Sequence, residues 1–208
     1  MLTEKQINDN KNRYLSLLDS VHREGTRELA LYLENECDFF VAPASTKYHG
    51  NFKGGLCAHC LYVYDILNDL VEKYCKDEEI GYESIVVSAL LHDMQKINYY
   101  EPTSFNKKEY SPYGSKSDEV GKFDWVSTKG YKIIEEPNRF IYGNHEETCE
   151  FIARQFIPLS IEESAAILHH MGGLGFDSIK EGLNEVYRRY HLALLLHIAD
   201  TMAAILYC

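Results

Sequence analysis

The sequence contains no long apolar run. Its N-terminal stretch, MLTEKQINDNKNRY, is polar and lacks the apolar core of a signal peptide. No segment approaches the ~20 apolar residues that a helix needs to cross a bilayer. We therefore expect a cytoplasmic protein that does not contact a membrane.

Basic residues are scarce. Lys and Arg number 21 against 32 Asp and Glu, which gives a formal net charge of -11 at pH 7. Binding along a nucleic acid depends on basic side chains that neutralise its phosphates, so we do not expect extended nucleic acid as a partner. A locally basic pocket could still accept a nucleotide or the end of a short oligonucleotide. The composition leaves the oligomeric state open.

Cysteine is also sparse, and its six residues come without a secretion signal. Because disulfides form in oxidising compartments, we expect reduced thiols. Cys57 and Cys60 have the spacing of a metal or redox motif. However, the sequence holds no second pair of this kind, and both residues lie within an apolar helical pattern. We therefore interpret the pair as buried thiols.

Helical patterning is abundant. Hydrophobic residues make up 45% of the 208 positions, which is enough for the buried core of one domain. Thr3 with Gln6, and Ser160 with Glu163, have the spacing of capping boxes at helix starts. Apolar residues recur at helical intervals after both boxes and in several other segments. The predicted helices cover Thr3 to about Val21, Thr26 to about Phe39, Leu56 to about Tyr74, Ser84–Lys96, a segment opened by Ser160, and Leu183–Leu206.

Residues 98–143 interrupt the helical pattern. Prolines and short alternating stretches such as KFDWVS and YKIIEE are typical of β-strands, so we expect one or two hairpins here. Trp125 and the tyrosines near it would form a small core of this insertion. The predicted fold is all-α, a helical bundle with a small β-hairpin insertion. It is one domain, 1–208, with N-terminal helices in 1–40, a metal-binding helical core in 41–97 and 144–208, and the insertion at about 98–143.

Ionisable side chains interrupt the most apolar segments. His59 lies in the third predicted helix, His92 and Asp93 close the segment IVVSALL, and Asp200 lies within LLLHIADTMAAIL. A buried carboxylate is costly unless it is paired, hydrogen-bonded or bound to a metal. Helical bundles build metal sites from side chains on facing helices. We interpret these four residues as metal ligands rather than hydrogen-bonded core residues, with a divalent Mn, Fe, Ni, Co, Zn or Mg ion as cofactor.

The order His59, His92-Asp93, Asp200 resembles the defining pattern of the HD superfamily of metal-dependent phosphohydrolases. GGLCAHCLYVYDIL and ALLHDMQKI match two of its motifs, and the resemblance extends over about residues 42–204. The chain is similar in particular to bacterial and phage HD hydrolases, and more distantly to HD-domain 3′-to-5′ exoribonucleases. The resemblance implies an HD-domain helical bundle.

By the same resemblance, three further histidines are candidate ligands of a second ion. His145 in YGNHEE and the pair His169-His170 in AILHHMGG resemble the additional ligands of two-metal HD enzymes, in which Asp93 would bridge the ions. The exoribonuclease motif reads His-His-Gly, whereas Met171 separates the pair from glycine here. Alignment on the glycine favours His170, and His169 stays as the alternative. The number of ions therefore stays at one or two.

Lys96 completes an HD-x-x-K pattern. Lys96 comes four residues after His92, so it lies one turn on along the same face of the predicted helix. Its ammonium would bind a substrate phosphate there, which makes Lys96 and Asp93 the candidate catalytic residues. The resemblance also makes Ser45, Thr46 and His49 of the loop PASTKYHG candidate substrate contacts, with an ordinary solvated loop as the alternative.

These residues favour hydrolysis of a phosphate ester, in a nucleotide or a similar small phosphorylated substrate, by metal-activated water. Two ions would clamp the attacking and leaving oxygens of such a reaction. Two alternatives share the same site. A di-iron HD-fold oxygenase would use these imidazoles and carboxylates with O₂, and a non-catalytic HD module would sense a nucleotide.

Overall fold

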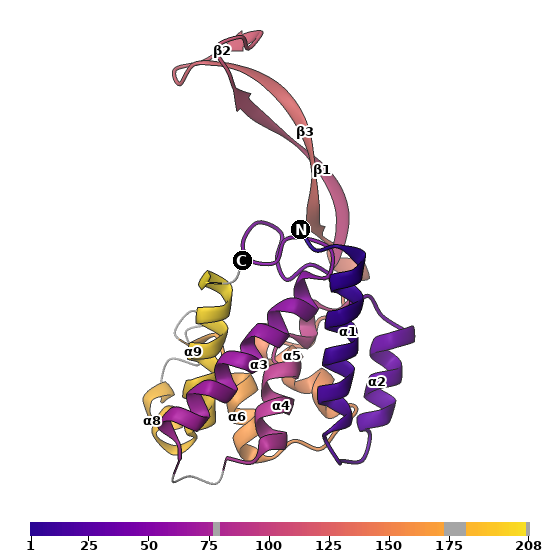
Figure 1. The fold of residues 1–208 in the computed structure, drawn as a ribbon, viewed down its shortest axis with the longest axis vertical. Coiled ribbons are helices and arrows are strands. Elements are labelled where there is room, and N and C mark those ends of the chain that lie inside the picture. The colour runs from indigo at the N-terminus through magenta and orange to yellow at the C-terminus, as the bar shows by residue number, and fades with distance from the viewer. Residues whose placement is uncertain (77–79, 173–181, 207–208) are drawn as a thin grey trace.

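The computed structural model describes residues 1–76, 80–172 and 182–206. A bundle of α-helices makes up most of this part of the chain, and a β-hairpin projects from one end of the bundle (Figure 1). None of the helices described is long and apolar enough to cross a membrane. The mostly helical fold is thus confirmed. The helices are α1 (Glu4–Asp19), α2 (Thr26–Asn35), α3 (Gly55–Tyr74), α4 (Tyr82–Leu91), α5 (His145–Arg154), α6 (Ile161–Leu168), α8 (Leu183–Arg189) and α9 (His191–Leu206).

Both predicted capping boxes are present. At α1, the Thr3 side chain accepts a hydrogen bond from Gln6 N at 3.3 Å, and the Gln6 side chain accepts one from Thr3 N at 2.9 Å. At α6, Ser160 and Glu163 exchange the same two bonds. Each box satisfies N–H groups that a helix start otherwise leaves without partners. The cap of α6 fixes the start of a helix that leads to the candidate site.

The second helix ends earlier than the sequence predicts. α2 stops at Asn35 rather than near Phe39. Phe39 and Phe40 leave the helical path and pack on the Tyr14 ring, with centroid distances of 4.8 and 5.6 Å. All three rings are buried. Burial of these large apolar groups outweighs another turn of helix.

The prediction of one continuous helix over residues 84–96 is wrong. α4 ends at Leu91, Asp93 leaves the helical region at φ -112° and ψ 20°, and a 3₁₀ turn, η1, covers Met94–Lys96. Lys96 N donates to Asp93 O at 3.0 Å. Residues three apart are eclipsed in a 3₁₀ turn. The turn therefore places Lys96 over Asp93 instead of on a continued helix face.

The insertion forms one long hairpin. β1 (Tyr100–Tyr110) pairs antiparallel with β3 (Lys122–Ile133) in an unbroken register, and the short β2 (Lys116–Ser117) pairs with the start of β3. KFDWVS and the first half of YKIIEE both lie on β3, so they do not belong to separate hairpins. A second 3₁₀ turn, η2 (Glu136–Asn138), leads the chain back to the bundle.

The hairpin meets the bundle at its base and projects away from it toward its tip (Figure 1). The strands extend far from the helices (Figure 1), and most of their residues are exposed. Phe123 is the buried residue of the hairpin, whereas Trp125 is half exposed and packs edge-on against Phe123. The predicted small core therefore centres on Phe123.

The prediction of a single helix over residues 183–206 is also wrong. Tyr190, with φ -126° and ψ 89°, separates α8 from α9. A straight helix of that length would extend about 36 Å. The break instead lets Val186, Tyr187 and Tyr190 pack onto the apolar cluster that α3 and α9 share. This packing is the physical reason for the break.

α3 is the central helix, and it packs against α1, α4 and α9. One apolar cluster joins its first half to α1, α2 and α4, and a second joins its remainder to α9. Cys57 and Cys60 are buried in the first cluster as free thiols, as predicted. His59 is buried on the same helix, so it points into the bundle, where α9 brings Asp200 to it.

Candidate metal centre

Three segments bring His59, His92 and Asp200 together. His59 lies in the first half of α3, His92 directly follows the last residue of α4, and Asp200 lies on α9. One potential ligand atom of each lies within 4.8 Å of the others. His59 Nε2 is 3.0 Å from Asp200 Oδ1 and 3.3 Å from His92 Nε2. These three side chains form a group that could hold a metal ion.

Asp93, His145 and His170 form a second such group. His145 is the first residue of α5, and His170 follows the end of α6. His145 Nε2 lies 3.1 Å from Asp93 Oδ1 and 3.2 Å from His170 Nε2. The fold thus places side by side three residues that are distant in the sequence.

Asp93 lies between the two groups. Its Oδ1 faces His145, while its Oδ2 lies 3.5 Å from both His59 Nε2 and His92 Nε2. The Asp93 side chain is 2% exposed, so water has little access to either oxygen. A carboxylate with one oxygen toward each group has the position of a bridging ligand.

Backbone carbonyls determine which ring nitrogen carries the proton in two of these histidines. His92 Nδ1 lies 2.9 Å from Ala89 O, and His170 Nδ1 lies 2.7 Å from Ile167 O. A carbonyl oxygen only accepts hydrogen bonds, so Nδ1 donates in both rings. Nε2 of the neutral ring then carries a lone pair. Metal-binding histidines have the same arrangement, with the second ring nitrogen donating to a carbonyl or carboxylate.

The Nε2 atoms of the two groups face one another in pairs. His92 Nε2 faces His59 Nε2 at 3.3 Å, and His170 Nε2 faces His145 Nε2 at 3.2 Å. Two lone pairs at this distance repel unless a proton or a metal ion lies between them. His59 Nδ1 is buried and has no hydrogen-bond partner among the described residues. This set of imidazole and carboxylate donors fits a divalent transition metal.

The charges of the site also favour a cation. Burial raises the pKa of Asp93, but the Lys96 ammonium and then the His92 ring lower it, and the net pKa lies well below the ordinary value. The pKa of Asp200 is also well below its ordinary value, because bonds to the neighbouring imidazoles outweigh burial. Burial and two imidazoles nearby lower the pKa of His170 to about 3. Ionised carboxylates and a neutral His170 are protonation states that bind metal ions. Burial lowers the pKa of His92 and of His145, but Asp93, with Cys149 in the case of His145, raises both above the ordinary value, so a metal ion would have to displace a proton from these two rings.

Lys96 is held against the bridging carboxylate. Its Nζ donates to Asp93 Oδ2 at 2.7 Å, and its side chain is 14% exposed. Burial lowers the pKa of Lys96, but Asp93 raises it more, so the net shift is upward and the ammonium stays charged. Lys96 also lines the pocket over the site. A cation therefore stands beside the place where a substrate would meet the candidate ligands.

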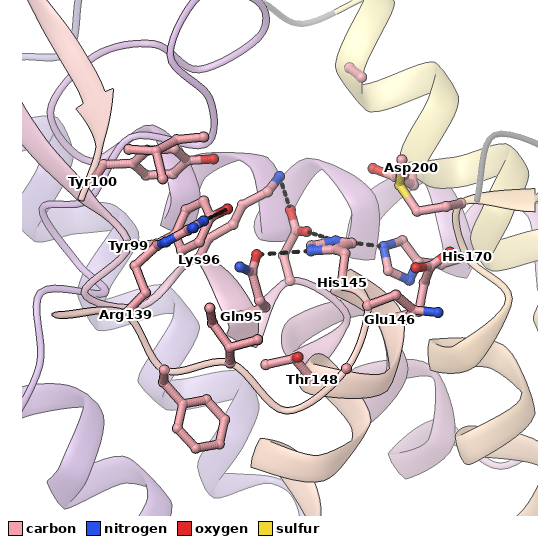
Figure 2. Close-up of a pocket in the computed structure, with 18 of the residues that line it drawn as sticks. Gln95, Lys96, Tyr99, Tyr100, Arg139, His145, Glu146, Thr148, His170 and Asp200 are labelled. Atoms are coloured by element: carbon pink, nitrogen blue, oxygen red, sulfur yellow. Dashed lines mark hydrogen bonds and ion pairs between the residues drawn. The ribbon is translucent and has the colours of Figure 1, made fainter. Parts of the chain in front are cut away.

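A pocket with a volume of about 920 Å³ opens over both groups. Its floor includes Asp93, His145, His170 and Asp200. Figure 2 shows Lys96, Tyr99, Tyr100 and Arg139 together on one side of His145, with His170 on the other. The two tyrosines and Arg139 come from the insertion. The base of the hairpin thus forms one wall of the pocket.

Of the three predicted loop contacts, His49 is the one that lines the pocket. Its ring centroid lies 4.7 Å from that of His59, its Nε2 is buried without a partner among the described residues, and burial lowers its pKa to about 4. Ser45 Oγ instead donates to His49 O at 2.7 Å and accepts from Tyr48 N at 2.9 Å. Ser45 and Thr46 are not among the lining residues. The Ser45 bonds close the loop and position His49.

His169 lies outside both groups of candidate ligands. It follows the last residue of α6, and its carbonyl accepts a hydrogen bond from Tyr187 Oη at 3.0 Å. Its neighbour His170 reaches the site instead. Gly172, which follows the pair, has φ +57°, and a Cβ there would lie 2.6 Å from the His197 ring. Glycine at this place permits the close approach of α9.

Several polar residues of the pocket were not singled out from the sequence, and three of them bear on the site. Gln95 Oε1 lies 3.0 Å from His145 Nδ1. Glu146 is buried, and its Oε1 has no partner in the described part of the chain. Arg139 is the third. Adjacency to Asp93 and His145 was a signal for the first two, because each comes within two residues of a candidate ligand. Arg139 had no such signal.

Comparison with known proteins found no match to this chain among protein-family models, curated proteins or solved structures.

Proposed function

We propose that this chain is a metal-dependent phosphohydrolase of the HD family, which acts on a nucleotide or a similar phosphate ester. The observation that carries the proposal is the position of Asp93, between two groups of imidazole and carboxylate donors, with Lys96 on one of its oxygens. Two-metal hydrolases of phosphate esters need this combination of two cation sites and a bridging anion.

The residues around the two groups would hold the ions and the substrate in place. A divalent ion, when bound, supplies a water of lowered pKa and neutralises charge on a phosphate oxygen. Asp93 sets the spacing of the two cation sites, because each of its oxygens faces one group. Gln95 holds the His145 ring by its Nδ1, so that Nε2 faces the site. His49 offers its free Nε2 to the substrate.

Lys96 favours phosphate chemistry over the oxygenase alternative. A di-iron oxygenase would use the same four imidazoles and two carboxylates, and their donor set suits iron. A buried ammonium beside the site has no evident task in that reaction, whereas it matches the negative charge of a phosphoryl group. Lys96 would donate a hydrogen bond to a non-bridging phosphate oxygen of the substrate. This bond would replace the one to Asp93 or be made in addition to it.

The experiment is hydrolysis of generic phosphate esters by the purified protein with added Mn²⁺. We expect release of p-nitrophenol or phosphate that EDTA stops and that does not consume O₂. The double variant His92→Ala/Asp93→Ala removes a ligand from each group, and it should have no activity. His22→Ala, on the exposed side of the bundle, is the matched control. Turnover that survives the double change, or that requires O₂, would overturn the proposal.

A further inference from the structure

Arg139 occupies an unusual place in the pocket wall. It follows the 3₁₀ turn η2, in an extended conformation with φ -95° and ψ 144°. Its side chain is 18% exposed and lines the pocket that opens over the two metal-ligand groups. Figure 2 shows its guanidinium on the same side of the pocket as Lys96 and Tyr99. A second cation thus faces the space where a substrate would lie.

The guanidinium is fixed in orientation but not saturated with partners. Its Nη1 donates to the Tyr99 hydroxyl at 3.1 Å, and it lies 5.5 Å from the centroid of the Tyr99 ring. Its Nη2 lies 3.3 Å from a carboxylate oxygen of Glu136, whose side chain is 77% exposed. Its Nε is buried and has no hydrogen-bond partner among the described residues.

This arrangement is typical of a guanidinium that binds an anion. A buried donor left without a partner is destabilising, so the fold gains nothing from leaving Nε free. The ion pair with an exposed glutamate is weak and easily exchanged. The tyrosine keeps the planar guanidinium in one orientation, which reduces the entropy that a ligand must remove on binding. The forked N–H donors match the oxygens of a phosphate.

We propose that Arg139 binds a second phosphate group of the substrate, apart from the one that reacts at the metal centre. The inference rests on the proposed function and deepens it. Lys96 is bonded to Asp93, so it serves the phosphoryl group at the metal-ligand groups. Arg139 is hydrogen-bonded to Tyr99 in the wall and serves another phosphate of the same molecule. The substrate class is therefore a phosphate ester with at least two phosphates, such as a nucleoside di- or triphosphate.

The test measures binding without catalysis. Inorganic phosphate, pyrophosphate and tripolyphosphate are titrated by calorimetry into the protein in EDTA, so that no ion contributes. Arg139→Met removes the guanidinium but keeps an apolar chain of similar length. Arg188→Met is the matched control, because Arg188 is 76% exposed and lies on α8, away from the lining residues.

We expect tripolyphosphate to bind more tightly than phosphate. Arg139→Met should weaken tripolyphosphate binding by about 10- to 100-fold, which corresponds to the loss of one or two charge-assisted hydrogen bonds. The same variant should change the dissociation constant for phosphate by less than about threefold. Arg139→Lys, which keeps the charge and loses the fork, should restore part of the loss. Equal effects on all three anions, no effect on any, or no binding of tripolyphosphate by the unchanged protein would overturn the proposal.

Kinetics separates this inference from the proposed function. If Arg139→Met raises the KM for a nucleoside triphosphate by a much larger factor than the KM for p-nitrophenyl phosphate, both proposals are supported. If no ester is hydrolysed but the calorimetric selectivity depends on Arg139, the hydrolase proposal fails and the phosphate site stands. If esters are hydrolysed and the variant keeps its preference for polyphosphates, the phosphate site fails alone.

Discussion

Asp93 Oδ1 lies 3.1 Å from His145 Nε2 within the second ligand group, so the carboxylate of Asp93 leaves its other oxygen for the first group. Asp93 comes from the turn after α4, whereas His145 begins α5. The other oxygen of Asp93 faces His59 and His92. Loss of the Asp93 carboxylate should therefore disturb both groups at once, whereas loss of a histidine should disturb one.

Asp93→Asn is predicted to remove both ions. The amide keeps the shape of the side chain but loses the negative charge that two cations would share. Elemental analysis after dialysis should find less than one equivalent of metal per chain, compared with two in the unchanged protein. His22→Ala should keep the full content. Two equivalents retained by Asp93→Asn would exclude a bridging role for Asp93.

Gln95→Leu is predicted to lower the affinity for one of the two ions selectively. Gln95 is a positioning residue, since its Oε1 lies 3.0 Å from His145 Nδ1. Removal of such a partner typically lowers metal affinity about 10- to 100-fold. Competition with a chelator should reveal one weakened site and one unchanged site. Gln155→Leu, at the exposed end of α5, serves as the control. A parallel loss at both sites would contradict the assignment of His145 to one group.

Lys96→Met is predicted to lower phosphohydrolase activity without removing metal. Lys96 would give the phosphoryl group a charge-assisted hydrogen bond of about 1.5–3 kcal/mol, so kcat/KM should fall about 10- to 100-fold. Metal content should stay the same. Lys53→Met, which removes an exposed lysine paired with Glu4, should have normal activity. Unchanged kcat/KM in Lys96→Met would exclude a substrate role for this residue.

Glu163→Gln is predicted to destabilise the bundle in a pH-dependent way. The buried Glu163 accepts two bonds of 2.7 Å from Arg23 and one of 2.6 Å from Ser84. Burial raises the pKa of Glu163, but the bonds from Arg23 and then Ser84 lower it to a net value below the ordinary one. Loss of this ion pair should lower the free energy of unfolding by about 2 kcal/mol at pH 7.

The direction in which this stability changes with pH follows from the lowered pKa of Glu163. Glu163 contributes its stability above the unfolded-state pKa of about 4.3, and the contribution disappears as the pH falls through the lower folded-state pKa. Urea unfolding at several pH values should show the difference between variant and unchanged protein shrink below about pH 4. Glu185→Gln, at an exposed ion pair, should show little difference at any pH. A difference that is constant with pH would rule out the ionised pair.

Local signals in the sequence predicted a large part of this fold. Two of the three capping boxes among the described helices were recognisable, because each depends on residues three apart. The third, Asn144 with Glu147 at the start of α5, was not predicted. The ionisable residues that the site brings together stood out because they interrupt apolar segments. The structure confirms that His59, His92 and Asp93 are buried. Their role as ligands stays a prediction.

The features of the fold and site that the sequence did not predict depend on contacts between distant segments. The end of α4 at Leu91 is set where Asp93 turns toward the site, and no local breaker marks it. Arg139 reaches the pocket because the unbroken pairing of β1 with β3 returns the chain beside Tyr99. Neither the length of that hairpin nor the partner of Arg139 can be derived from residue types alone.

Anomalous diffraction from crystals soaked in Mn²⁺ tests the central claim most directly. We predict two peaks separated by about 3.5–4 Å, one bounded by His59, His92 and Asp200 and the other by His145 and His170, with Asp93 between them. Crystals that show no peak at these residues, with the imidazole rings bonded only to one another and to protein carboxylates, would contradict the account.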